Sequence, residues 1–103
     1  MYMINLLQTE AYRLTGDKEY IRRAAREMVL YLDRLQLDDG LFHHAPDVPI
    51  AWGRGAGWMA AGMPLVLSCM DEGDEHYAEI LAGYRRMMER LLECQRKDGL
   101  WGQ

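Results

Sequence analysis

The sequence has no long hydrophobic run and no segment in which β-branched residues alternate with polar ones. No apolar stretch approaches the roughly 18 residues needed to cross a bilayer, and the first residues lack the basic region and small-residue cleavage site of a signal peptide. The lack of alternation argues against a β-sheet protein. With Met1 as the natural start, we expect no membrane association and a cytoplasmic location.

The chain also has few cysteines and no net positive charge. The two cysteines, Cys69 and Cys94, lie in apolar helical stretches without a Cys-x-x-Cys motif or a disulfide framework, which indicates buried thiols in a reducing compartment. Acidic residues outnumber basic ones, 16 to 12, for a net charge of −4. An acidic chain without a basic cluster argues against nucleic acid or an anionic membrane as a partner.

The chain does contain hydrophobic residues at helical spacing, and these predict an all-α fold with at most a short extended piece near residues 41–44. The four predicted helical segments are residues 3–14, 17–37, 58–70 and 75–96. The second and fourth are amphipathic, as expected for surface helices with one buried side. The third carries no charge, so we expect other helices to enclose it.

Two finer expectations concern the first and third segments. In the first, the apolar residues predicted to share a buried face are Met3, Leu6, Leu7, Ala11 and Leu14. In the third, Pro64 lacks a backbone donor and clashes with the preceding turn. We therefore expect a kink at Pro64 or a helix that begins closer to it.

Two short patterns each occur twice. Gly-Asp-x-x-Tyr, at residues 16–20 and 73–77, places a helix-stopping glycine beside an N-capping aspartate and predicts the tight turn of a helical hairpin. Asp-Gly-Leu-aromatic, at residues 39–42 and 98–101, follows each amphipathic segment. The order of helix, turn, helix and loop is therefore repeated.

We interpret residues 1–103 as one partial domain with hairpin repeats 1–42 and 54–101. Hairpins of this length stack into solenoids or closed toroids. In a toroid, the first and third helices would form the inner ring. Two hairpins leave apolar sides of these helices open, so we expect a homo-oligomer.

The segment P-I-A-W-G-R-G-A-G-W, residues 49–58, differs from the rest of the chain. Each glycine costs a helix about 1 kcal/mol relative to alanine, and the string lacks the spacing and preceding strand of a dinucleotide-binding motif. Trp52 and Trp58 can be core aromatics or a stacking surface for a sugar ring. Arg54 can form an ion pair, cap a helix C-terminus, or bind an anionic ligand.

A metal site is not indicated. His43 and His44 are adjacent, so their side chains are expected to point apart. Asp39 and Asp47 are nearby, but no third ligand has the spacing of a metal site.

Three motifs together resemble the unsaturated uronyl hydrolases of glycoside hydrolase families 88 and 105, with the rhamnogalacturonyl branch the closer match. They are Trp-Gly-Arg-Gly-x-Gly-Trp at residues 52–58, Asp-Gly-Leu-aromatic-x-His at 39–44, and Gln-x-x-Asp-Gly-Leu-Trp at 95–101. The resemblance implies an (α/α)6 barrel of six hairpins, of which this chain supplies two to two-and-a-half. Other (α/α)6 enzymes, such as sugar epimerases, lack the tryptophan and arginine motif.

The resemblance also implies site residues and chemistry. Trp52 and Trp58 would line the sugar pocket, Arg54 would contact the sugar, and His44 would face the same pocket. The substrate would be a 4,5-unsaturated uronic acid at the non-reducing end of a pectin- or glycosaminoglycan-derived oligosaccharide. An aspartic acid protonates the C4–C5 double bond, water adds at C5, and the hemiketal rearranges to release the aglycone, without a metal or organic cofactor.

The aspartate of the family stands in an Asp-x-x-aromatic-Met motif whose end aligns with residues 1–3. The resemblance therefore places the acid upstream of Met1, and we expect the 103-residue chain to have no catalytic residue and to be inactive alone. The alternative is a non-catalytic helical hairpin module that associates with itself.

Overall fold

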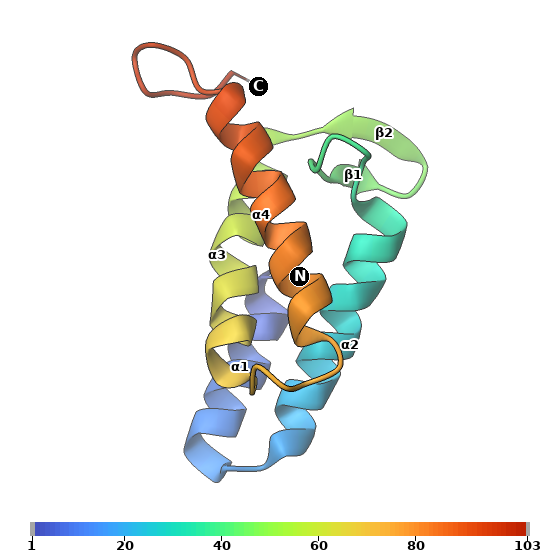
Figure 1. Cartoon of the computed structure of the whole chain (residues 1–103), viewed down its shortest axis with the longest axis vertical. Helices are drawn as coiled ribbons and strands as arrows, with labels where there is room; N and C mark the ends of the chain where they lie inside the picture. The colour runs from blue at the N-terminus through green and yellow to red at the C-terminus, as the bar shows by residue number, and fades with distance from the viewer. Residues whose placement is uncertain (1, 103) are drawn as a thin grey trace.

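The computed structural model describes residues 2–102, which form helical hairpins and one small β-hairpin (Figure 1). The elements in chain order are α1 (Tyr2–Thr15), α2 (Lys18–Leu35), β1 (His43–Ala45), β2 (Val48–Ala51), α3 (Gly53–Cys69) and α4 (Tyr77–Glu93). The all-α prediction is confirmed. The antiparallel pair of β1 and β2 is an addition, since only an extended piece near its first strand was expected. None of the described helices is long and apolar enough to span a membrane.

The turn between α1 and α2 follows the sequence prediction. Gly16 has a φ of 71°, and its N–H donates to the Tyr12 carbonyl at 2.7 Å. The Asp17 carboxylate accepts a hydrogen bond from the Glu19 N–H at 2.9 Å and caps α2. A glycine in the left-handed region and a capping aspartate thus reverse the chain within two residues.

The turn between α3 and α4 is longer than predicted. Asp74 accepts a hydrogen bond from the His76 N–H at 2.9 Å, but α4 begins only at Tyr77, with His76 in the N-cap position. Gly73 does not adopt a positive φ. The prediction of a second glycine stop is therefore wrong, because the seven residues of this connection, 70–76, leave room to turn without a left-handed residue.

The core lies between two layers, in which α1 packs beside α3 and α2 beside α4. Helical spacing predicts a buried stripe of six residues in α2. Five are buried, and the sixth, Leu35, is partly buried; the five are Ile21, Ala24, Ala25, Met28 and Leu32. In α4, helical spacing predicts that Ile80, Met87 and Met88 face inward. Ile80 and Met87 are fully buried, whereas Met88 is 38% exposed. The core is rich in methionine, a flexible side chain that fills irregular space.

The predicted buried face of α1 is wrong. Met3, Leu7 and Leu14 are 72%, 71% and 86% exposed, while Asn5 and Thr9 are completely buried. Hydrophobic spacing identifies a face that could be buried, but the neighbours decide which face is. Both α2 and α3 pack against α1, and they cover its polar side rather than its apolar stripe.

The expectations for α3 also need correction. The helix begins at Gly53, well before the expected Trp58, and it continues through Pro64 to Cys69. Its first turn is closed by a hydrogen bond from the Ala56 N–H to the Trp52 carbonyl at 2.9 Å. The other helices do not enclose α3, because Trp58 is exposed on its open side.

Candidate functional site

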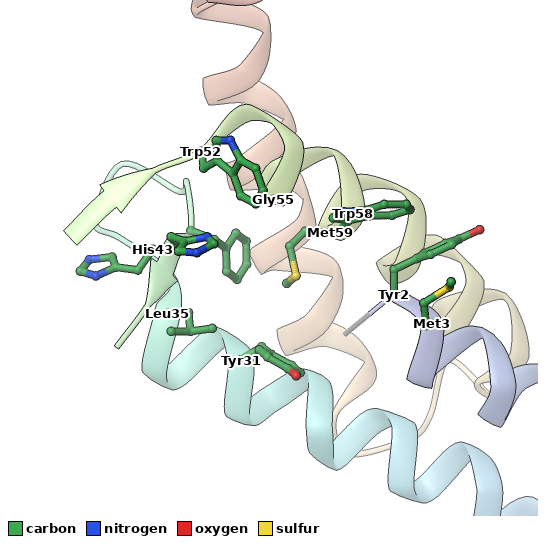
Figure 2. A pocket seen from close by; sticks show the side chains of 11 residues that line it. Tyr2, Met3, Tyr31, Leu35, His43, Trp52, Gly55, Trp58 and Met59 are labelled. Atoms are coloured by element: carbon green, nitrogen blue, oxygen red, sulfur yellow. The ribbon is translucent and has the colours of Figure 1, made fainter. Parts of the chain in front are cut away.

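A pocket of about 350 Å³ lies where the β-hairpin meets the start of α3, the end of α2 and the first turn of α1 (Figure 2). The eleven side chains around it are mainly aromatic or apolar. They are Tyr2, Met3, Tyr31, Leu35, Phe42, His43, His44, Trp52, Gly55, Trp58 and Met59. Three of the four residues that the sequence assigned to a sugar site, namely His44, Trp52 and Trp58, are among them.

Trp52 is placed by the junction between β2 and α3. It occupies the N-cap of α3 in an extended conformation, with φ −126° and ψ 122°, so its side chain leaves the helix axis beside the β-hairpin. The ring of His44 meets the indole edge-on, with the ring centres 4.9 Å apart and an interplanar angle of 84°. This contact between β1 and the start of α3 holds one wall of the pocket.

Trp58 forms a second wall, six residues further along the chain in α3. Its indole stacks on the ring of Tyr2 from α1, with the centres 5.0 Å apart and an interplanar angle of 26°. Trp58 is 46% exposed, so a large part of its surface stays open to solvent. An exposed indole fixed by one stacking partner is available to a ligand.

Arg54 is not part of the pocket wall. Its guanidinium lies over the Trp52 ring, with Cζ 4.0 Å from the ring centre, and no ion pair with a described carboxylate holds it. Of its three sequence interpretations, the structure shows neither the ion pair nor a cap at a helix C-terminus, because Arg54 lies in the first turn of α3. The positive charge is therefore free to meet an anion beside the Trp52 wall.

The glycines of the motif are less crowded than expected. A Cβ on Gly57 would have no neighbour within 4 Å among the described residues, and one on Gly55 would make ordinary contact with the Trp52 ring at 3.7 Å. No neighbouring helix requires glycine at either position. Of the two, only Gly55 lines the pocket, where the missing side chain leaves space for a ligand.

The sequence did not single out the wall contributed by α2 and by the residues before His44. Tyr31 and Leu35 belong to the buried edge of α2, a signal that helical spacing cannot distinguish from core packing. Burial, reinforced by the nearby Glu27 carboxylate, raises the pKa of Tyr31. The phenol therefore stays protonated; it hydrogen-bonds with Glu27, and its oxygen can accept a hydrogen bond from a ligand.

His43 also lines the pocket, although the sequence motif pointed to His44. The Nδ1 atom of His43 is buried, and no described residue forms a hydrogen bond with it. Among residues 2–102, no group of three or more His, Cys, Asp and Glu side chains is arranged to hold a metal ion. The polar groups of the lining side chains are imidazoles, phenols and indole N–H groups.

The pocket can bind a flat, partly apolar ring that carries polar groups at its edge. Indole faces stack on the apolar side of a sugar, and the imidazoles and the Tyr31 phenol can meet hydroxyl groups. None of the eleven lining residues is an aspartate or glutamate. The described wall therefore offers binding groups and no carboxylic acid.

Comparison with known proteins identifies the family. The model of Glycosyl Hydrolase Family 88 matches residues 1–103, the whole chain. The chain belongs to glycosyl hydrolase family 88. The resemblance inferred from the three motifs is thereby confirmed, and with it the interpretation of the helical hairpins as part of a six-hairpin all-α fold.

Two relatives of this family-88 chain share one name, unsaturated 3S-rhamnoglycuronyl hydrolase. The protein from Alteromonas sp. (strain LOR) is 26% identical over 98% of this chain, and the protein from Formosa agariphila is 35% identical over 89% of it. The matched regions are 27% and 23% of the relatives' lengths, so the chain spans about a quarter of each. No solved structure matches the chain.

Proposed function

We propose that this chain forms the sugar-binding wall of a hydrolase that acts on a 4,5-unsaturated uronic acid at the non-reducing end of an oligosaccharide. The proposal rests on the pocket between Trp52 and Trp58, with Arg54 beside it and His44 at its edge. The indoles would stack on the flattened unsaturated ring. The Arg54 guanidinium would form charge-assisted hydrogen bonds with the uronate carboxylate.

The shared name of the two relatives favours rhamnose as the sugar attached to the unsaturated uronate. A substrate in which the unsaturated uronate is joined to rhamnose is a narrower class than the pectin- or glycosaminoglycan-derived substrates expected from the sequence. Galacturonate and glucuronate give the same ring once C4 and C5 are joined by a double bond, so the probes must differ in the attached sugar. Disaccharides of the unsaturated uronate with rhamnose, with galacturonate and with an amino sugar distinguish the substrate classes.

We propose further that the 103-residue chain binds this substrate without turning it over. Protonation of a vinyl ether double bond needs a general acid within reach of the carbon, and the family resemblance assigns this role to an aspartic acid. No aspartic acid lines the described pocket. The residues that do line it can position the substrate and exclude water from one side, but none of them is the aspartic acid that the resemblance assigns to proton transfer.

Calorimetric titration with the unsaturated uronyl-rhamnose disaccharide tests binding, and the absorbance of the C4–C5 double bond tests turnover. Binding without loss of absorbance is the expected result. Steady loss of absorbance, which the double variant Trp52→Ala/Trp58→Ala abolishes, would show that the chain contains its own acid. Absence of binding at millimolar sugar would refute the binding wall itself.

One observation supports a second role, as a helical module that associates with itself. The exposed stripe of α1 contains Met3, Ile4, Leu7 and Leu14, which are 72%, 47%, 71% and 86% exposed. An apolar stripe of this kind is typical of an interface. Sedimentation would show a concentration-dependent dimer if this role is correct, and a monomer at all concentrations would rule it out.

A further inference from the structure

Two loops of the chain have the same internal hydrogen bonds, and the first follows α2. We name residues 36–42 the α2 loop. The Gln36 side-chain amide donates to the Gly40 carbonyl at 3.0 Å, and the Leu41 N–H donates to the Asp39 carboxylate at 3.1 Å. Gly40 has a φ of 92°, which allows the chain to fold back on the glutamine.

The second loop, residues 95–101, is named the α4 loop. The Gln95 side-chain amide donates to the Gly99 carbonyl at 2.8 Å, and the Leu100 N–H donates to the Asp98 carboxylate at 3.1 Å. Gly99 has a φ of 83°. Each bond of the α2 loop thus has its counterpart here, so the two loops present the same backbone surface.

A helix covers the α2 loop. The Gln36 amide donates a second hydrogen bond to the Gly83 carbonyl of α4 at 2.9 Å, and its oxygen accepts one from the Arg86 guanidinium at 2.6 Å. Gly40 packs so closely that a Cβ there would lie 2.6 Å from the Arg86 carbonyl oxygen. Glycine, glutamine and arginine therefore form one contact between a loop and a helix.

The same surface of the α4 loop is open. A Cβ on Gly99 would have no described neighbour within 4 Å. Trp101 is 48% exposed, whereas Phe42 in the matching position of the α2 loop is 5% exposed. Leu92, at 70% exposure, extends the patch along the end of α4. The Gln95 side chain makes no second hydrogen bond with any described residue.

We infer that the α4 loop is a docking surface for an α-helix of a partner polypeptide in which glycine is followed three residues later by arginine. The glycine carbonyl of the partner would accept a hydrogen bond from the second N–H of the Gln95 side-chain amide. The partner's arginine would donate to the Gln95 side-chain oxygen. Gly83 and Arg86 make the same two bonds with Gln36 at the α2 loop. Glycine is needed because a Cβ on Gly83 would collide with the Leu32 side chain. The matching position in the α4 helix is Leu91, which has the same side chain.

A second copy of this chain does not supply such a helix. Among the described helices, only α4 has glycine followed three residues later by arginine, and that pair already binds Gln36. The partner helix also needs no second arginine. At the α2 loop Arg90 lies 3.4 Å from Asp39, but in the α4 loop Asp98 already pairs with Arg96 at 2.7 Å.

The test uses the 103-residue protein and a synthetic peptide with the sequence of residues 74–97, which contains α4 and its flanks. Binding is followed by calorimetry and by tryptophan emission. We expect saturable binding with a blue shift as Trp101 is covered. Peptides with Gly83→Leu or Arg86→Ala, and the protein variant Gln95→Ala, should each bind at least about tenfold more weakly.

Two further variants separate this contact from non-specific binding. Trp101→Phe places the aromatic residue of the α2 loop in the α4 loop, so it should retain binding and lose the blue shift. Glu72→Ala, in the exposed turn between α3 and α4, should bind as the parent does.

Four results would overturn the inference. One is equal binding by the Gly83→Leu and parent peptides, and another is unchanged affinity in Gln95→Ala. The third is no binding at millimolar concentration by a peptide locked as a helix with a lactam bridge on its far face. A dimer in which Trp101 is already shielded without peptide would instead assign the surface to a second copy and would equally refute a separate partner.

Discussion

The guanidinium carbon of Arg54 lies 4.0 Å from the centre of the Trp52 ring. The two residues are separated by one glycine at the start of α3, and their contact fixes a positive charge beside an aromatic wall. Loss of this contact should change the free energy of unfolding only slightly, but the contact orients the positive charge. It therefore bears on ligand affinity more than on folding.

Arg54→Ala should weaken binding of an unsaturated uronyl disaccharide by about 10- to 100-fold, since hydrogen bonds to charged groups contribute about 1.5–3 kcal/mol. The free energy of unfolding should fall by no more than about 1 kcal/mol, the value of an exposed cation–π contact. Calorimetry and urea unfolding measure the two effects. Arg54→Lys should recover part of the affinity, and an Arg54→Ala variant with full affinity would exclude the uronate contact.

Trp58→Ala should remove most of the sugar affinity, because it deletes one of the two indole walls and the partner of Tyr2. Trp58→Phe keeps a ring that can stack and should lose less than about tenfold. Since Trp58 is 46% exposed, both variants should remain folded. Far-UV circular dichroism checks the fold, and equal affinities for the alanine and phenylalanine variants would contradict a stacking role.

Gly40→Ala and Gly99→Ala form a matched pair. Both positions have positive φ, so each substitution should cost about 1–2 kcal/mol of unfolding free energy. Only at Gly40 would the new Cβ lie 2.6 Å from the Arg86 carbonyl oxygen, which should add about 1–3 kcal/mol. Urea midpoints give the comparison. Equal losses would mean that the α2 loop does not pack against α4 in solution.

Leu7→Glu and Thr9→Glu test which face of α1 is buried. Leu7 is 71% exposed, so its substitution should change the unfolding free energy by no more than about 0.5 kcal/mol. Thr9 is completely buried, and a carboxylate there should cost several kcal/mol. Thermal unfolding distinguishes the two. If the chain self-associates through the α1 stripe, Leu7→Glu should also shift sedimentation towards the monomer, whereas the reverse order of stability would restore the sequence prediction.

Gly55→Ala and Gly57→Ala separate helix propensity from pocket space. Both lie inside α3, where alanine is favoured over glycine by about 0.5–1 kcal/mol, so both should stabilise the protein. Only Gly55 lines the pocket, and only its alanine variant should weaken sugar binding. Identical affinities in the two variants would mean that the sugar does not reach Gly55.

Much of the fold was predictable because it depends on short-range patterns. The buried stripe of α2 follows from its helical spacing, and the turn at Gly16 and Asp17 follows from the need for a left-handed residue and a cap. The buried face of α1 was not predictable in this way. Its apolar residues lie on the side that no described neighbour covers, and the choice of neighbours is a long-range property.

The candidate site, like the fold, was predictable from the sequence only in part. The three motifs indicated the family and, with it, the pocket residues His44, Trp52 and Trp58. They did not indicate that Arg54 would lie over Trp52 rather than in the wall, or that His43 and Tyr31 would join the pocket. These placements depend on the β-hairpin and on the end of α2.

The sequence by itself determined the helical class, the family and the residue types of the pocket, because helical spacing, turn chemistry and motif identity are encoded within a few neighbouring residues. Only the tertiary structure decided which apolar surfaces are covered and where the pocket opens. It places Gln36 against Gly83 and leaves Gln95, with the same local bonds, exposed. Local hydrogen bonds are set by nearby residues, whereas burial requires a second element to arrive from elsewhere in the chain.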